Sequence, residues 1–243
     1  MSGRVAEARH RTPVPGPAFT RLLARVTGAE LPASGPALSG RLGQWFDWNR
    51  AVVLSRALDG RLPAPAGDGA PAADDDATAA CARAREMQAS AIVDEGAAAL
   101  ARVRERCASS GEAPDYAPFR QFHLARQRSM QAATGQLRGR LRDQLAHGPA
   151  DLARLAEVDA VMELTLSPRE QALLSGVPAM LGEHFERLRL AQASTGAGSV
   201  PAHTWLDAFS RDMQAVLLAE LDVRFQPIQA LLAALDPQTL RKT

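Results

Sequence analysis

The feature that most constrains this chain is an apolar stripe that runs from Ala202 to Leu235. Its large apolar residues recur at steps of three and four, which is the pattern of one buried face of an α-helix. A single helix of this length would span roughly 50 Å. Because such a helix is stable only when another surface covers its apolar face, the rest of the chain must supply partners. The stripe consists of Trp205, Phe209, Met213, Leu217, Leu221, Phe225, Ile228, Leu231 and Leu235.

Helical spacing of apolar residues recurs along most of the remaining chain, whereas alternating β-branched runs bounded by turns do not occur. The sequence therefore predicts an all-α protein. The expected architecture is an antiparallel bundle of long, kinked helices, and a bundle of this kind can have an elongated shape. Kinks are expected near Pro178 and Pro227, and Ser167-Pro168 is typical of the start of a new helix. The expected helices cover residues 19–26, 40–58, 78–109, 116–147, 151–166, 167–192 and 202–235.

Composition divides the chain into parts. A stretch rich in Pro, Gly and Ala that ends in three aspartates is typical of a flexible linker. The polar, Arg- and Pro-rich beginning of the chain is typical of disorder. The predicted division is a disordered tail at 1–16, an N-terminal helical pair at 17–59, a linker at 60–77, a main helical bundle at 78–236 and a tail at 237–243.

Bulk composition bounds the class of protein. A length of 243 residues with 46% hydrophobic content can bury a substantial core, and a net charge of +1 indicates neither nucleic acid nor a membrane surface. The two cysteines, Cys81 and Cys107, fall on one predicted helix, too far apart for a disulfide, which favours free thiols in a reducing compartment. The chain shows no signal peptide and no transmembrane stretch, so we expect a cytoplasmic protein without direct membrane insertion.

Motifs that carry chemistry are missing from the sequence. No Glu within the expected helices is followed by His three residues later, as a di-metal bundle site requires, and no glycine-rich phosphate loop or C-x-x-C motif occurs. We therefore assign no catalytic residue, no cofactor and no metal ligand. An enzyme without a recognisable motif remains a third hypothesis, and a polar pocket lined by His184, or by Glu163 and Glu170, would support it.

Two apolar regions are candidate contacts for a partner. Trp45, Phe46 and Trp48 form the densest aromatic cluster, and the first two are expected in the core while Trp48 lies on a different helical face. The stripe beyond Pro227 is the second region, because a kink there would leave its last segment uncovered. The candidate partner contacts are Trp48, Ile228, Leu231, Leu232 and Leu235.

Charge is distributed unevenly between the predicted helices. Residues 115–147 carry six arginines and two aspartates, whereas residues 202–236 carry two arginines and five acidic residues. The simplest interpretation is that a basic helix lies beside acidic ones within the fold, joined by surface ion pairs of modest strength. The alternative is that the arginines bind phosphates or an acidic partner. The candidate contacts are Arg120, Arg126, Arg128, Arg138 and Arg142.

Four stretches together resemble a known family. Residues 41–58 (RLGQWFDWNRAVVLSRAL), 116–131 (YAPFRQFHLARQRSMQ), 184–191 (HFERLRLA) and 205–235 are similar to a proteobacterial domain family of unknown function. The resemblance implies an all-helical protein of this size and carries no activity and no catalytic residues. It also implies gene neighbours that encode a coiled-coil membrane protein and a peptidoglycan-binding protein of the outer-membrane-protein-A type, somewhat like a flagellar-stator pair.

These observations favour a non-enzymatic, cytoplasmic helical protein that binds another protein, or a second copy of itself, through a helical face. The resemblance suggests that this partner is an envelope-associated membrane protein and that the chain is an accessory of a membrane or cell-envelope assembly. Intermolecular coiled-coil use of the stripe is one form of this hypothesis. A nucleic-acid-binding regulator that uses Arg120 to Arg142 is the less favoured alternative.

Overall fold

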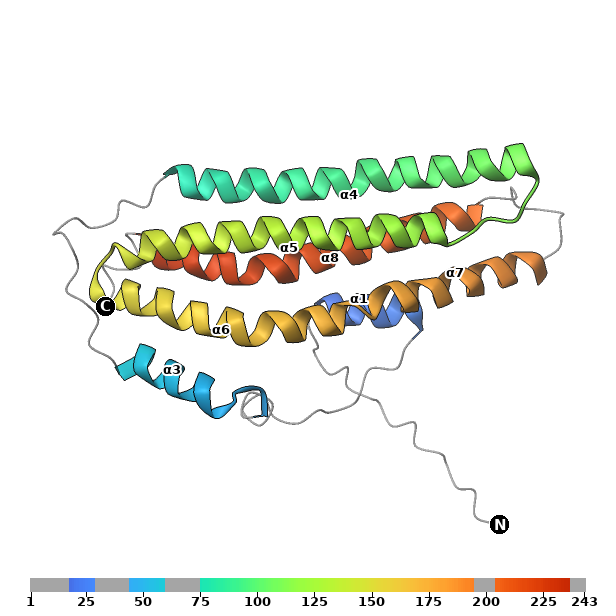
Figure 1. Cartoon of the computed structure of the whole chain (residues 1–243). Helices are drawn as coiled ribbons and strands as arrows, with labels where there is room; N and C mark the ends of the chain where they lie inside the picture. Colours follow the sequence, from blue (N-terminus) through green and yellow to red (C-terminus); the bar gives the residue numbers. More distant parts are fainter. Residues whose placement is uncertain (1–17, 29–43, 60–74, 195–203, 237–243) are drawn as a thin grey trace, which may run out of the picture.

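The computed structural model describes residues 18–28, 44–59, 75–194 and 204–236, and these residues form helices joined by short turns, without strands. The predicted all-α bundle is therefore confirmed. Labels follow Figure 1. The helices are α1 (Ala18–Thr27), α3 (Trp48–Asp59), α4 (Asp75–Ser110), α5 (Ala117–Ala146), α6 (Ala150–Leu174), α7 (Val177–Ser194) and α8 (Thr204–Leu235).

Four long rods build the body of the molecule, as Figure 1 shows. Helix α4, helix α5, the pair α6–α7 and helix α8 lie roughly along one axis. Helices α5 and α8 run in the same direction, and α4 and α6–α7 run in the opposite one. Consecutive rods are therefore antiparallel, as short connections between long helices require.

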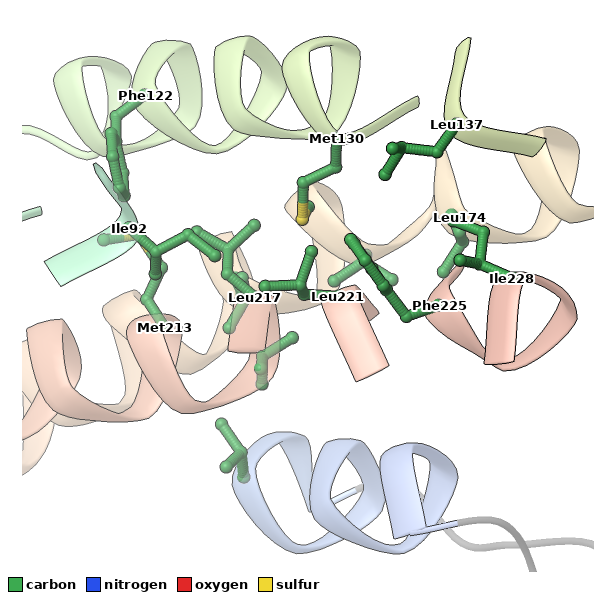
Figure 2. Packing of buried hydrophobic residues seen from close by; sticks show 14 of the residues in the cluster. Ile92, Phe122, Met130, Leu137, Leu174, Met213, Leu217, Leu221, Phe225 and Ile228 are labelled. Carbon is green, nitrogen blue, oxygen red and sulfur yellow. The ribbon is translucent and has the colours of Figure 1, made fainter. Parts of the chain in front are cut away.

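Helix α8 is the centre of the core. It packs against α4, α5, α7 and α1, and all nine residues of the apolar stripe are buried. In Figure 2, Met213, Leu217 and Leu221 of α8 point into the same cluster as Ile92 of α4 and Met130 of α5. The prediction of a long helix whose apolar face must be covered is confirmed. Helices on several sides of α8 cover that face.

The final part of the stripe differs from what the sequence led us to expect. Ile228, Leu231 and Leu235 were expected to be available to a partner, but the structure buries all three. Helix α8 continues through Pro227 without interruption, so the stripe keeps its register against the bundle. Leu232 is only half-buried and packs against the edge of the core.

The break between α6 and α7 also differs from expectation. Helix α6 continues through Pro168 instead of starting there, and the chain turns at Ser175 and Gly176. Pro178 then lies in the first turn of α7, where a missing N–H removes no helical hydrogen bond. The proline that was expected to kink a helix therefore stands at the start of one.

The two N-terminal helices, α1 and α3, attach to different helices of the bundle. Helix α1 packs on α7 and α8, and α3 packs on α6. Trp45 and Phe46, which were expected in the core, are only half-buried in front of α3.

A side chain of α7 forms hydrogen bonds with the C-terminal end of α1. The guanidinium of Arg187 donates to the carbonyl oxygen of Thr27 and, at 3.2 Å, to that of Val26. Gly28 follows with a φ of +69°, a left-handed conformation that glycine adopts without strain and that commonly ends a helix. His184 accepts from Arg187 at 3.2 Å and binds Asp212 at 2.8 Å, which connects α1, α7 and α8.

Both cysteines are free thiols, and burial raises the pKa of Cys81, offset in part by nearby Arg140. Within the described residues, no helix has the combined length and apolar character that crossing a membrane requires.

Candidate functional site

A charged group lies at the centre of the bundle. Glu220 of α8 has no solvent exposure, although it lies between Leu217 and Leu221 on the buried face. Its Oε2 accepts a hydrogen bond of 3.0 Å from the side-chain amide of Gln127 on α5. The same amide donates to the carbonyl oxygen of Leu174 at the end of α6, at 3.2 Å. Gln127 therefore joins the buried carboxylate to the end of a neighbouring helix.

Arg224 carries this polar network toward the surface. Its Nε and Nη2 donate to Oε1 of Glu220 at 3.0 and 2.8 Å, and its Nη1 donates to Glu170 of α6 at 3.0 Å. The Arg224 side chain is 8% exposed, whereas that of Glu170 is 38% exposed. Paired charges of this kind avoid the cost of an isolated buried ion, because each keeps hydrogen-bond partners.

His123 of α5 lies next to this network without joining it. Its Nε2 is 3.9 Å from Oε2 of Glu220, beyond hydrogen-bond distance, and neither ring nitrogen has a hydrogen-bond partner among the described residues. Burial lowers the pKa of His123 to about 4, so its ring is neutral at pH 7. Burial also raises the pKa of Glu220, and the contacts from Gln127 and Arg224 oppose that rise.

A groove of about 480 Å³ opens where α5, α6 and α8 meet, and Glu170 and Arg224 lie on its wall. Gly135 of α5 helps to form its hollow, because a Cβ added there would meet nothing within 4 Å. Pro168 of α6 and Pro227 of α8 both line it. The lining residues are Gln131, Thr134, Gly135, Arg138, Arg142, Ala160, Glu163, Leu164, Ser167, Pro168, Glu170, Gln171, Arg224 and Pro227.

A second ion network forms the other end of the groove. Arg138 binds Asp159 of α6 through two hydrogen bonds, Nε to Oδ2 at 2.8 Å and Nη2 to Oδ1 at 2.6 Å. Arg142, one turn later, donates to the same carboxylate at 3.0 Å and also to Glu163. The two arginines thus clamp α5 to α6, and bidentate pairs of this geometry also fix the register of the two helices.

The groove holds two carboxylates that are engaged in ion pairs. Glu163 and Glu170 both line it, which is the arrangement that the enzyme hypothesis required. Each of these carboxylates nevertheless already forms an ion pair with an arginine. His184 lies outside the groove and is held by Asp212. Thr134, which lines the groove, already donates its hydroxyl to the carbonyl oxygen of Met130 at 2.8 Å.

The candidate arginines of α5 divide into two groups. Arg138 and Arg142 are held by α6, and Arg126 binds Glu95 of α4 at 3.1 Å. Arg120 and Arg128 are exposed. Two acidic residues of α8 bind α4, where Arg104 binds Asp207 at 2.5 Å and Arg85 binds Asp222. The basic helix α5 therefore lies beside the acidic helices α6 and α8, as expected, and its ion pairs run to α6 and α4.

Exposed apolar side chains concentrate on two neighbouring helices. Trp48, at the start of α3, is 81% exposed, and Leu164, at the rim of the groove, is 67% exposed. Helices α3 and α6 carry five of the eight large apolar side chains that the described residues expose. These five are Trp48, Val53, Leu58, Leu164 and Leu173, and the other three are Met87, Val93 and Leu190.

Sequence reasoning missed the buried network. Glu220 and Arg224 were counted only as charges of an acidic helix, although their spacing holds a signal. Glu220 follows Leu217 by three residues and precedes Leu221 by one, so it falls within the buried face. A charged residue at such a position, with an arginine four residues later, indicates a buried pair.

The fold and the groove define an all-helical bundle protein with a buried charge network. Within the described residues, no group of three or more His, Cys, Asp or Glu side chains is placed to hold a metal ion. The chain belongs to the family described as "Protein of unknown function (DUF3348)", whose model matches residues 5–237. A search of curated proteins found no match, and a search of solved structures found none either.

Proposed function

We propose that this protein is a non-enzymatic accessory protein that binds a segment of another protein through the face formed by α3 and α6. The observation that carries the proposal is the concentration of exposed apolar side chains on these two neighbouring helices, with Trp48 81% exposed on α3, and Leu173 74% and Leu164 67% exposed on α6. Tryptophan is enriched where interfaces gain most of their binding energy. The apolar stripe of α8 is not the proposed binding surface, because other helices of the same chain already cover it.

Charge on α6 indicates the chemistry of the partner segment. Helix α6 carries five acidic residues and two arginines. At the groove, the carboxylates of Glu163 and Glu170 are more exposed than the guanidiniums that bind them. A partner segment that combines apolar residues with lysine or arginine would complement this surface. Such a segment would place its apolar residues against Leu164 and its basic ones against the carboxylates.

Two further elements of the proposal rest on other grounds. The link to a membrane or cell-envelope assembly, and hence a cytoplasmic protein with an envelope-associated partner, rests on the gene neighbourhood that the family resemblance implies. The nucleic-acid alternative has less support, because Arg126, Arg138 and Arg142 are engaged in ion pairs within the fold. Only Arg120 and Arg128 of that set remain exposed without an acidic partner among the described residues.

Site-specific photo-cross-linking tests the proposal. A photoreactive phenylalanine analogue would replace Trp48 or Leu164 in the full chain, in cells that contain the native membranes. The matched control places it at Met87 of α4, which is 61% exposed and lies on another helix. We expect one defined protein adduct from positions 48 and 164 and none from position 87.

Each outcome decides between the alternatives. An adduct with an envelope-associated protein supports the full proposal, whereas an adduct with a second copy of the chain replaces the foreign partner with self-association. Equal adducts from all three positions, or none from 48 and 164 in a monomeric protein, would remove the α3–α6 face from consideration.

A further inference from the structure

A second cavity lies on the opposite rim of α5, away from the groove. It has a volume of about 420 Å³ and is formed by α4 and the first turns of α5. This volume falls within the usual range of small-molecule sites, roughly 300 to 1,000 Å³. The cavity is lined by Glu95, Arg102, Arg106, Ala117, Pro118, Gln121, Phe122 and Ala125.

Two arginines of this cavity differ from the others on the same helix. Helix α4 carries five arginines, and Arg83, Arg85 and Arg104 each bind an aspartate. Arg102 and Arg106 form no ion pair with the described residues, and both line the cavity. They are four residues apart, so they lie on one face of α4 with their guanidiniums within reach of the same ligand.

Neighbouring charges leave this cavity positive. Glu95 is the one carboxylate among its lining residues, and Arg126 already neutralises it at 3.1 Å. Asp115, just before α5, accepts from the backbone N–H of Ala117 at 3.1 Å and does not line the cavity. Glu112 and Asp115 line a smaller adjoining cavity of about 80 Å³, which Arg106 borders from its other side. The two unpaired guanidiniums therefore dominate the larger cavity.

We propose that this cavity binds a small molecule through a phosphate or carboxylate group held by Arg102 and Arg106. Guanidiniums bind both groups through paired hydrogen bonds. Gln121 offers an amide that can donate or accept, and Phe122 and Ala125 offer an apolar wall for the body of the ligand. A local pair of arginines in a hollow between two helices favours a small anion over a nucleic acid, which needs an extended basic surface.

Titration calorimetry of the full chain at low ionic strength tests the proposal, with inorganic phosphate, pyrophosphate and citrate as probes. A short DNA duplex is the comparison probe. The test variant is Arg102→Gln with Arg106→Gln. The matched control is Arg120→Gln with Arg128→Gln, which removes two exposed arginines from α5 and leaves the cavity intact. Circular dichroism would establish that both variants keep the helical fold.

We expect at least one small anion to bind, with affinity about tenfold or more weaker in the Arg102/Arg106 variant and unchanged in the control. The preferred probe then distinguishes a phosphate ligand from a carboxylate ligand. Absence of binding by the unaltered protein overturns the proposal. So does an equal loss in both variants, and so does binding of the duplex alone, since these results would assign the arginines to a diffuse basic surface.

Discussion

Glu220 and Arg224 lie one helical turn apart on α8, and the guanidinium of Arg224 binds a single carboxylate oxygen through two of its nitrogens, at 3.0 and 2.8 Å. The carboxylate is fully buried, and the guanidinium nearly so. A surface pair at this spacing contributes a few tenths of a kcal/mol. Here the positive charge of Arg224 instead compensates the negative charge of Glu220 at the centre of the core. The contribution of each residue to stability therefore depends on the presence of the other.

Arg224→Met should therefore destabilise the fold strongly, because it leaves Glu220 as a buried charge without its cation. We expect the free energy of unfolding to fall by about 3 to 5 kcal/mol. Chemical denaturation followed by circular dichroism at pH 7 measures it. Arg211→Met on the same helix removes an exposed arginine and should change stability by no more than about 0.5 kcal/mol.

A second variant separates the buried charge from lost packing. Glu220→Gln combined with Arg224→Met removes both charges, so it should be more stable than Arg224→Met alone. A loss below about 1 kcal/mol in the single variant would mean that Glu220 is protonated or hydrated in the folded protein.

His123 should make the free energy of unfolding depend on pH. Its pKa is about 4 in the folded protein against an ordinary value of 6.5, so the unfolded chain takes up a proton first as pH falls. The stabilising contribution of neutral His123 is complete above pH 6.5 and disappears as pH falls toward 4. The amount lost is up to about 3 kcal/mol. Denaturation curves recorded between pH 7 and 4 measure it.

His123→Leu should flatten that dependence, and His147→Leu, which alters an exposed histidine, should leave it unchanged. Glu220 acts with the opposite sign, because its raised pKa makes the folded state relatively more stable as pH falls. Comparison with His123→Leu removes this common contribution. Parallel pH curves for the original protein and His123→Leu would show that the histidine is hydrated or already protonated.

Leu217→Ala tests the covered stripe. Leu217 has no solvent exposure, so its truncation should cost roughly 2 to 5 kcal/mol of unfolding free energy. Leu164→Ala removes a similar side chain from the groove rim and should change stability by no more than about 0.5 kcal/mol. Similar losses at both positions would contradict the distinction between a buried core and an exposed apolar face.

Gly135→Ala and Gly139→Ala form a matched pair on α5. An added Cβ meets nothing within 4 Å at either position, so both should raise the free energy of unfolding by about 0.5 to 1 kcal/mol. Gly135 lines the groove and Gly139 does not. If the partner segment occupies the groove, only Gly135→Ala should reduce the adduct formed from position 164. Equal adduct yields would place the segment elsewhere on the α3–α6 face.

Periodicity predicted the helices well because burial repeats along them. The nine residues of the α8 stripe are all buried, and on α5 the large apolar residues that recur at helical spacing are buried too, namely Phe119, Phe122, Met130, Leu137, Leu141 and Leu145. The positions at which one helix ends and the next begins were less predictable. Proline is tolerated inside α6 and α8, since the surrounding bundle compensates for one missing hydrogen bond at Pro168 and at Pro227.

The groove and the buried network could be predicted only in part. Trp48 was expected on an exposed face, and the structure exposes it. The partners of Arg138 lie 21 residues away or more, and Glu170 lies 54 residues from Arg224. Such pairings depend on how the rods are rotated against each other, which the spacing within one helix does not determine. Exposure of Leu164 likewise follows from the hollow beside Gly135.

The central position of α8 has a consequence for how the protein is made. A ribosome completes α4, α5, α6 and α7 before it reaches α8, so their inner faces must wait for the helix that covers them. Contacts such as Arg85 with Asp222 join residues 137 positions apart, and they can form only at a late stage of synthesis. Nascent chains that lack α8 would expose apolar surface, which is the condition that recruits chaperones and promotes aggregation.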